Sequence, residues 1–153
     1  MPKLSPSLAR LLATFFYIGD SPFAPGSAAT LMAALIWIAF SNNLFAYGII
    51  LAVVLVVGFS VSGQVEKDLA QKDPSLIVID EVAGGLIAFF MLPINFPVLI
   101  TAFFLFRAFD MFKIYPVYKF ENLRGSGGIM LDDIFAGIYT NLVMHAALKI
   151  LGG

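Results

Sequence analysis

Three long stretches of this chain contain no Asp, Glu, Lys or Arg. They run over residues 21–65, 82–106 and 134–148. The longest of them exceed the ~20 apolar residues that a helix needs to cross the hydrocarbon core of a bilayer. The chain is also 60% hydrophobic and only 12% charged, whereas a typical soluble domain has about 25% charged residues. The sequence therefore predicts an all-α, polytopic integral membrane protein built as a helical bundle.

Length and composition narrow the class further. The 153 residues indicate a single membrane-embedded domain over residues 1–153. A cleavable signal peptide is not expected, because Pro22, Pro25 and Gly26 interrupt the first apolar segment. The absence of Cys excludes disulfides, thiol nucleophiles and thiolate metal ligands. Nothing in the net charge of −1 indicates a nucleic-acid partner, and the oligomeric state stays open.

The apolar pattern predicts about five membrane-embedded helices, preceded by an interfacial helix at residues 8–19. The five are expected at residues 27–40, 44–62, 74–92, 97–115 and from 126 toward the C-terminal end. Asn42 and Asn43 mark a tight turn between the first two. Asp73 and Pro74 predict the start of the third helix, with Asp73 as its N-cap.

The basic residues indicate how these helices are oriented. In a five-span arrangement seven of them fall on the side of the amino terminus: Lys3, Arg10, Lys67, Lys72, Lys113, Lys119 and Arg124. The turns on the opposite side carry none, and only Lys149 lies at the far end. Because Lys and Arg concentrate in cytoplasmic loops, the amino terminus and both long loops are expected in the cytoplasm.

Three of the predicted helices carry ionisable residues at a similar depth, a turn or two below the cytoplasmic surface. These residues are Asp80 and Glu81; Arg107, Asp110 and Lys113; and Asp132 and Asp133. Five carboxylates thus face two cations, and a buried Asp in a span costs on the order of 3 kcal/mol. A divalent cation would balance the excess negative charge, and oxygen-only ligands favour Mg²⁺ over zinc.

Other residues have simpler interpretations. The lone His145 lies far from the acidic layer and is expected to be a packing or interface residue. Gly84, Gly85 and Gly137 each follow an acidic pair and are expected to let helices approach closely. Arg107 and Asp110 are three residues apart and could simply form an ion pair on one helix.

The segment SPFAPGS (residues 21–27) adds a possible anion site. Ser27 is expected to cap the first helix, whose free N–H groups point into the same cytoplasmic layer. Helix N-termini commonly bind phosphate. Carboxylates, a divalent cation, two basic residues and an anion-binding helix end together suggest phosphoryl chemistry on a lipid headgroup at the inner leaflet.

The motifs IVIDEVAGG (77–85), FRAFDMFKIYP (106–116) and GGIMLDDIFAG (127–137) closely resemble the phosphatidylglycerophosphatase A family. The resemblance covers nearly the whole chain. It implies Mg²⁺-dependent removal of the terminal phosphate from phosphatidylglycerophosphate in the bacterial inner membrane, with the active site on the cytoplasmic side. It also places six residues at the family's active-site motifs: Asp80, Glu81, Asp110, Lys113, Asp132 and Asp133.

From these considerations we expect specific roles. Asp80, Glu81, Asp132 and Asp133 are predicted metal ligands; with Asp110 they form the predicted catalytic set. Lys113, Arg107 and Ser27 are the predicted phosphate-binding residues.

The chain departs from the family pattern at four positions. The family tends to have Pro where Ile114 stands, Gly where Tyr17 and Ala29 stand, and Thr where Ser27 stands. Ser27 keeps the hydroxyl group. None of the departures removes a charged group, but Ile114 and Ala29 could alter loop shape and headgroup preference.

Two mechanisms and two further functions stay open at this point. Either a water attacks phosphorus or an Asp does so and forms an aspartyl-phosphate; several carboxylates committed to metal favour water. An ion- or metal-coupled transporter would also bury acidic residues, but transport sites usually lie near the bilayer midplane. The second function that stays open is a lipid headgroup phosphotransferase.

Overall fold

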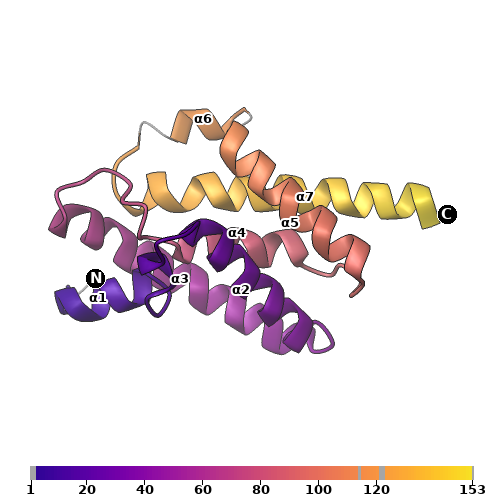
Figure 1. The fold of residues 1–153 in the computed structure, drawn as a ribbon, viewed down its shortest axis with the longest axis horizontal. Coiled ribbons are helices and arrows are strands. Elements are labelled where there is room, and N and C mark those ends of the chain that lie inside the picture. The colour runs from indigo at the N-terminus through magenta and orange to yellow at the C-terminus, as the bar shows by residue number, and fades with distance from the viewer. Residues whose placement is uncertain (1–2, 114, 121–122, 153) are drawn as a thin grey trace.

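The computed structural model describes residues 3–113, 115–120 and 123–152, and every regular element in these ranges is a helix (Figure 1). The elements are α1 (Pro6–Ala13), the short 3-10 helix η1 (Ile18–Asp20), α2 (Pro25–Phe40), α3 (Leu44–Asp68), α4 (Ile79–Phe89), α5 (Phe96–Phe112), α6 (Val117–Phe120) and α7 (Ser126–Gly152). The predicted all-α class is therefore confirmed.

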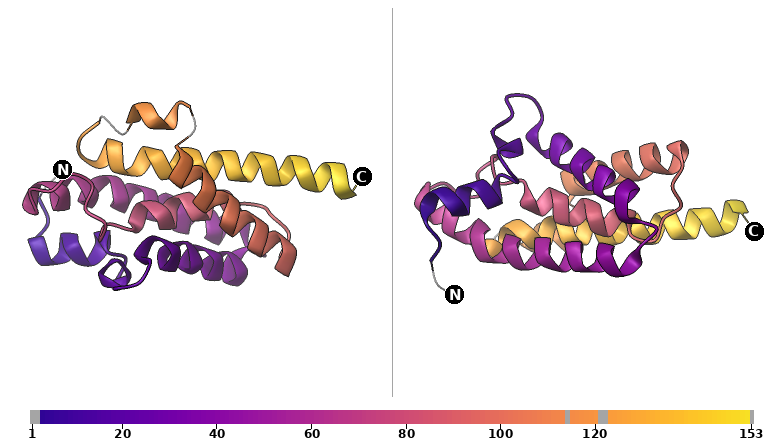
Figure 2. Two further views of the ribbon diagram at one scale, coloured as in Figure 1. Left: turned by 45° about the horizontal axis from the view of Figure 1, so that its top comes forward. Right: turned by 90° about the horizontal axis from the view of Figure 1, so that it is seen from below.

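The short helix α4 forms the centre of the bundle. All but two of its 11 residues are buried, Asp80 among them. It packs against α2, α3, α5 and α7, and in both views of Figure 2 it runs through the middle of the molecule. At 1.5 Å per residue α4 is only about 16 Å long, roughly half the thickness of a hydrocarbon core. It therefore does not cross a membrane by itself.

The start of α4 differs from the sequence prediction. Residues 71–78 form turns, and the helix begins at Ile79 rather than at Pro74. The backbone of Asp73 lies in the left-handed region, with φ +46°, and the N–H of Val78 donates to the carbonyl of Ala13 at 3.0 Å. The prediction that Asp73 caps a helix at Pro74 is wrong, because a tertiary hydrogen bond to the end of α1 holds this segment in a non-helical path.

Other helix ends also differ. The expected helix at residues 8–19 is instead α1 followed, after a turn, by η1. Helix α2 begins at Pro25 with Ala24 as N-cap and no side-chain capping bond. Ser27 lies inside its first turn, so the prediction that Ser27 caps this helix is wrong. Helix α3 continues to Asp68, six residues beyond the predicted end at Ser62, because the polar residues that follow are themselves good helix formers. Asn43 caps α3 by accepting the N–H of Ala46 at 3.1 Å, as its place in the predicted turn allows.

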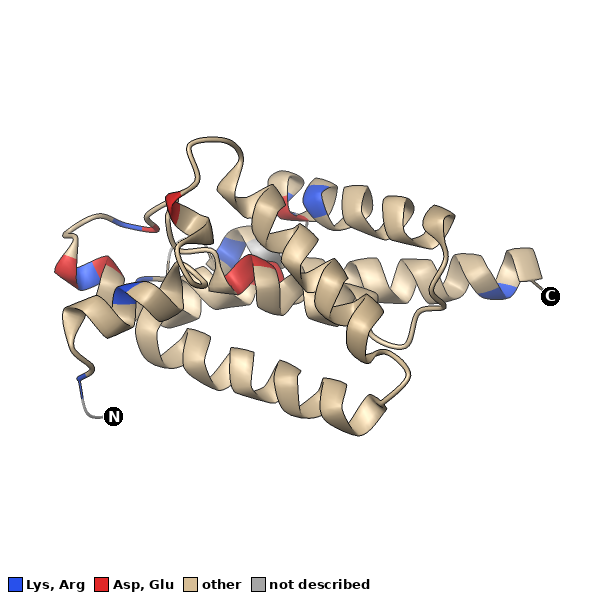
Figure 3. Cartoon of the chain, turned by 60° about the horizontal axis from the view of Figure 1, so that its bottom comes forward, with Lys and Arg blue, Asp and Glu red and all other residues tan. Residues whose placement is uncertain are grey.

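Two helices, α3 and α7, are long and apolar enough to cross a membrane, with 25 and 27 residues. The outer side of α3 exposes large apolar side chains, including Phe45 (80% exposed) and Val56 (60% exposed). Figure 3 shows that the charged residues gather in the half of the bundle that holds the N-terminus, whereas the other half is nearly bare of charge. A soluble protein would not leave such surfaces in water, so this distribution is that of a membrane protein.

Candidate active site

A cavity of about 340 Å³ opens where four helices and one loop meet. It is lined by residues 24–27 at the start of α2, residues 73 and 75 of the α3–α4 loop, and Asp80, Glu81, Arg107, Asp110, Lys113, Ile129, Asp132 and Asp133. All eight residues that the sequence analysis selected line this one cavity. The structure therefore brings together side chains that are up to 106 positions apart, from Ser27 to Asp133.

Three of the carboxylates that line this cavity meet. Asp80, Glu81 and Asp133 each offer an oxygen, and these three oxygens lie within 4.8 Å of one another. Asp80 and Asp133 are only 6% and 3% exposed. One oxygen of each of the three has no hydrogen-bond partner within the described part of the chain. Buried acceptors without donors are costly, so this arrangement fits a bound cation.

Glycines allow these carboxylates to meet. Gly84 lies one turn after Asp80 on α4, and Gly137 lies one turn after Asp133 on α7. A Cβ built on Gly84 would stand 2.5 Å from the carbonyl oxygen of Asp133, and one on Gly137 would collide with the carbonyl of Gly84. The prediction that these glycines permit close helix packing is confirmed.

Asp132 has a different partner from its neighbour in the sequence. Its Oδ2 accepts from the Lys113 ammonium at 2.9 Å. Lys113 is the C-cap of α5 and adopts φ +43°, which turns the chain away from the helix axis. Asp132 is therefore not one of the three carboxylates that meet, and its role as a metal ligand stays a prediction.

Arg107 and Asp110 form an ion pair at 2.8 Å along one side of α5. Both side chains are partly buried, at 21% and 20% exposure. This is the local i, i+3 pairing that the sequence allowed. Because both residues also line the cavity, the ion pair with Asp110 holds the Arg107 guanidinium at the wall of the cavity.

The first turn of α2 closes another wall of the cavity. A Cβ on Gly26 would lie 2.5 Å from a Glu81 carboxylate oxygen and 3.1 Å from the Arg107 guanidinium. The backbone of this turn therefore packs directly against two site residues. Unpaired N–H groups at a helix start attract anions, and Ser27 lines the cavity from this turn although it caps nothing.

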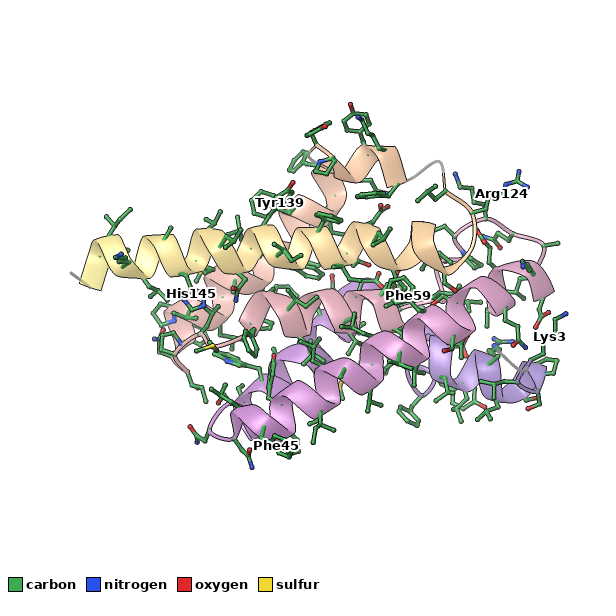
Figure 4. The ribbon with its side chains drawn as sticks, turned by 180° about the vertical axis from the view of Figure 1, so that it is seen from behind. Lys3, Phe45, Phe59, Arg124, Tyr139 and His145 are labelled. Carbon is green, nitrogen blue, oxygen red and sulfur yellow. The ribbon has the colours of Figure 1, made fainter. Side chains whose placement is uncertain are left out.

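His145 lies outside this site, as predicted. Its Nε2 contacts the carbonyl of Phe90 at 3.2 Å. In Figure 4 His145 and Arg124, which precedes α7, lie toward opposite ends of that helix.

Two acidic residues near the site were not assigned to it from the sequence. Asp73 lines the cavity, whereas we expected it to cap a helix. Glu66 is 8% exposed near the end of α3 and was not selected at all. For Asp73 the sequence offered one signal: it precedes Pro74, and the residue before a proline is biased away from helical conformation. For Glu66 the sequence offered no such signal.

Most of the chain matches a known protein family. The sequence model of the family described as "Phosphatidylglycerophosphatase A" matches residues 11–148. The chain belongs to the phosphatidylglycerophosphatase A family. It is 33% identical to phosphatidylglycerophosphatase A of Escherichia coli, over 89% of this chain and 81% of that protein. It is 32% identical to phosphatidylglycerophosphatase A of Haemophilus influenzae, over 90% and 86% of the two chains.

A third relative carries a different name. The chain is 36% identical to a Bacteroides thetaiotaomicron protein named as a candidate phosphatidylinositol-3-phosphatase, over 95% of this chain and 96% of that protein. No solved structure matches the chain.

The structure places three of the four departures from the family pattern. Tyr17 has φ +67°, a conformation that glycine adopts without steric cost, which accounts for the family's Gly at this position. Ala29 is fully buried in α2, and Ser27 lines the cavity. Ile114 lies outside the described residues.

Proposed function

We propose that this chain is a lipid phosphatase that hydrolyses the terminal phosphomonoester of phosphatidylglycerophosphate to phosphatidylglycerol and phosphate. Membership of the phosphatidylglycerophosphatase A family supports this function, as do the names of two relatives. One structural observation carries the proposal: a single cavity collects six carboxylates, an arginine, a lysine and a helix N-terminus. That set matches what binding and cleavage of a phosphomonoester require.

The proposal includes a divalent cation, and Mg²⁺ is the expected ion. Asp80, Glu81 and Asp133 would hold it, because their oxygens lie within 4.8 Å of one another and all are hard ligands. When bound, the ion would polarise the phosphoryl group and neutralise charge on it. Such an ion would also account for three carboxylates that lie together in a membrane protein, two of them almost fully buried.

The terminal phosphate would be held by the cationic side of the cavity. Lys113 and Arg107 line it from the end of α5, and each already has an acidic partner that limits its motion. The first turn of α2 offers backbone N–H groups on a neighbouring wall. These groups orient the phosphate and stabilise the charge on its oxygens during transfer.

Water supplies the attacking oxygen in this proposal, because three carboxylates would be engaged with the cation and Asp110 and Asp132 are ion-paired. The bond between phosphorus and the glycerol oxygen breaks as the bond from water to phosphorus forms. One water proton passes to a site carboxylate, which later releases it to solvent, and the glycerol oxygen takes up one proton from solvent water in the cavity and leaves as a hydroxyl group. The products are phosphatidylglycerol and inorganic phosphate.

The membrane arrangement is also part of the proposal. We infer a multi-pass protein of the bacterial inner membrane with α2, α3, α4, α5 and α7 embedded, α4 enclosed by the others, and α1 at the interface. The site then opens to the cytoplasmic leaflet, where the acyl chains of a substrate stay in lipid while its phosphate enters the cavity. Two apolar helices of sufficient length and the charge distribution (Figure 3) support this arrangement.

A phosphatidylinositol 3-phosphate phosphatase is a second candidate function, because the relative with 36% identity carries that name. Purified protein should be given each lipid phosphate in detergent micelles without nucleotide or acceptor alcohol, and released phosphate should be measured. Release from phosphatidylglycerophosphate at the higher kcat/KM supports the proposal, whereas preference for the inositol lipid selects the second candidate. No release from either lipid contradicts both, and it is the result expected of a transporter or a headgroup phosphotransferase.

A further inference from the structure

Asp73 lines the catalytic cavity although it belongs to none of the helices that carry the other acidic residues. It lies in the loop between α3 and α4, and no helix begins at Pro74. Its side chain shares the cavity with Lys113 and Asp110. It also lines a second, adjoining hollow together with Asp132, the partner of Lys113. Asp73 thus has the location of a functional residue and no structural task as a helix cap.

The backbone of Asp73 is held in an unfavourable conformation. Its φ of +46° lies in the left-handed region, which costs a non-glycine residue roughly 1 kcal/mol. Such conformations persist only where surrounding contacts hold them, and they concentrate at functional sites. The contacts that hold Asp73 therefore indicate what the loop is built to do.

Glu66 supplies these contacts from the last turns of α3. The side chain of Glu66 is 8% exposed, and its Oε1 accepts the backbone N–H of Asp73 at 3.3 Å. Its Oε2 accepts the backbone N–H of Gly125, immediately before α7, at 2.5 Å. One buried carboxylate therefore ties the loop of Asp73 to the segment that leads into the helix of Asp132.

We propose that Asp73 and Glu66 are positioning residues for Lys113, an inference that rests on the proposed phosphatase function. Glu66 fixes the backbone of Asp73, and Asp73 and Asp132 act on the Lys113 ammonium from two different elements. A lysine side chain is a flexible four-carbon stem and loses much rotamer entropy when its ammonium is held in one place. Holding it in advance keeps its charge directed at the phosphate, which is what makes a cation effective in transfer.

The test is a double-mutant cycle on Asp73 and Lys113. Asp73→Asn keeps the volume of the side chain and removes its charge. We expect kcat/KM for the lipid phosphate to fall on the order of tenfold. Inorganic phosphate, used as a competitive inhibitor, should bind more weakly, although removal of a nearby negative charge alone would strengthen its binding. The direction of the change in phosphate affinity therefore distinguishes a positioning role of Asp73 from a purely electrostatic effect of its charge.

The cycle also separates positioning from a purely structural role. In the Lys113→Ala background, Asp73→Asn should cause no further loss of kcat/KM, because the group that it positions is gone. Losses that multiply would show that Asp73 acts independently of Lys113 and would overturn the proposal. Unchanged kinetics and phosphate inhibition in Asp73→Asn would overturn it as well.

Glu66 provides a second, graded series. Glu66→Gln keeps one acceptor oxygen and should retain more activity than Glu66→Ala, which keeps none, whereas the exposed Asp68→Asn on the same helix should resemble the wild type. Equal activity in both Glu66 variants and the wild type would contradict its role. Thermal unfolding of each purified variant in detergent reports folding; if Glu66→Ala does not fold, the Asp73 and Lys113 cycle decides the question. Absence of phosphate release from the wild type would instead refute the proposed function itself.

Discussion

Gly84 on α4 and Gly137 on α7 face each other where the two helices cross, so closely that neither position has room for a methyl group. Each glycine lies one turn beyond an acidic residue of the site, Asp80 or Asp133. The separation of the two backbones at this crossing therefore sets how closely the two carboxylates approach. Helix packing and the spacing of these two carboxylates are therefore coupled at one contact.

Substitution of Gly84 by Ala should push α4 and α7 apart. Overpacking of this kind costs about 1–3 kcal/mol, and we expect a lower unfolding temperature together with at least a tenfold loss of phosphatase activity. Gly48→Ala on α3 is the matched control, because a Cβ there meets nothing within 4 Å and Ala favours a helix over Gly. Normal activity in Gly84→Ala would show that the carboxylates tolerate a wider spacing.

Asp→Asn substitutions should distinguish the aspartates that are predicted to bind the cation from those that form ion pairs with basic residues. Asp80→Asn and Asp133→Asn should each lower kcat on the order of 10²-fold or more, and the remaining activity should need a higher Mg²⁺ concentration. Asp110→Asn and Asp132→Asn should also lower kcat about 10²-fold, through the ion pairs with Arg107 and Lys113. Activity titrated against Mg²⁺ measures both effects, and His145→Ala should be nearly silent.

Chelation should abolish activity and lower stability together. Without a cation, the clustered Asp80, Glu81 and Asp133 repel one another and a phosphate dianion. We therefore expect EDTA to stop phosphate release and to lower the unfolding temperature, and added Mg²⁺ to restore both. Full turnover in excess EDTA would exclude the metal. An Asp133→Asn variant should show a smaller shift of unfolding temperature with Mg²⁺ than the wild type.

The pH dependence of stability should change in Asp73→Asn. Asp73 is exposed on the cavity surface, and partial desolvation there is the main cause that raises the pKa of its carboxyl above the ordinary 3.8; Glu66 and Asp110 raise it further, whereas Lys113 and Lys72 lower it. A raised pKa means that the folded protein binds the proton more tightly than the unfolded chain, so the ionised group reduces stability at neutral pH. The variant should therefore unfold at a higher temperature than the wild type at pH 7.

The difference in unfolding temperature between Asp73→Asn and the wild type should shrink as the pH falls through the raised pKa of Asp73 in the folded protein toward the ordinary value of 3.8. Unfolding temperatures of both proteins measured across this range test the sign. A variant that is less stable than the wild type at pH 7 would contradict the assignment.

Labelling of single cysteines tests which side of the membrane holds the site. The chain has no Cys, so introduced thiols react alone. Arg124 and Asn42 are exposed at opposite ends of the bundle, whereas Ser126 is half-buried and its Oγ accepts the N–H of Gly63 at 2.8 Å. Arg124→Cys should react with a membrane-impermeant reagent only in inverted vesicles, and Asn42→Cys only in intact cells. Reaction of Arg124→Cys from outside intact cells would place the cavity at the other leaflet.

Local sequence patterns were sufficient for the class of protein and for eight of the residues that line the cavity. Charge-free runs predict membrane helices because the cost of a charge in lipid acts on each residue separately. The motifs around Asp80, Asp110 and Asp132 identified residues that line the cavity for the same reason, since charged residues inside predicted membrane helices are costly and are seldom kept without a function. Helix boundaries were less accurate, because the start of α4 depends on a hydrogen bond from Val78 to the distant Ala13.

Only the tertiary structure decided which carboxylates act together. Asp132 and Asp133 are adjacent, but successive residues on a helix point about 100° apart. Asp133 therefore turns toward Asp80 and Glu81, while Asp132 turns toward Lys113. Which of the two faces α4 depends on how α7 is rotated, and that rotation is set by the contact of Gly137 with Gly84. In the same way, only the packing of α3 against the loops shows that Glu66 and Asp73 belong beside the site, because neither lies in a motif that local sequence could separate from an ordinary polar loop.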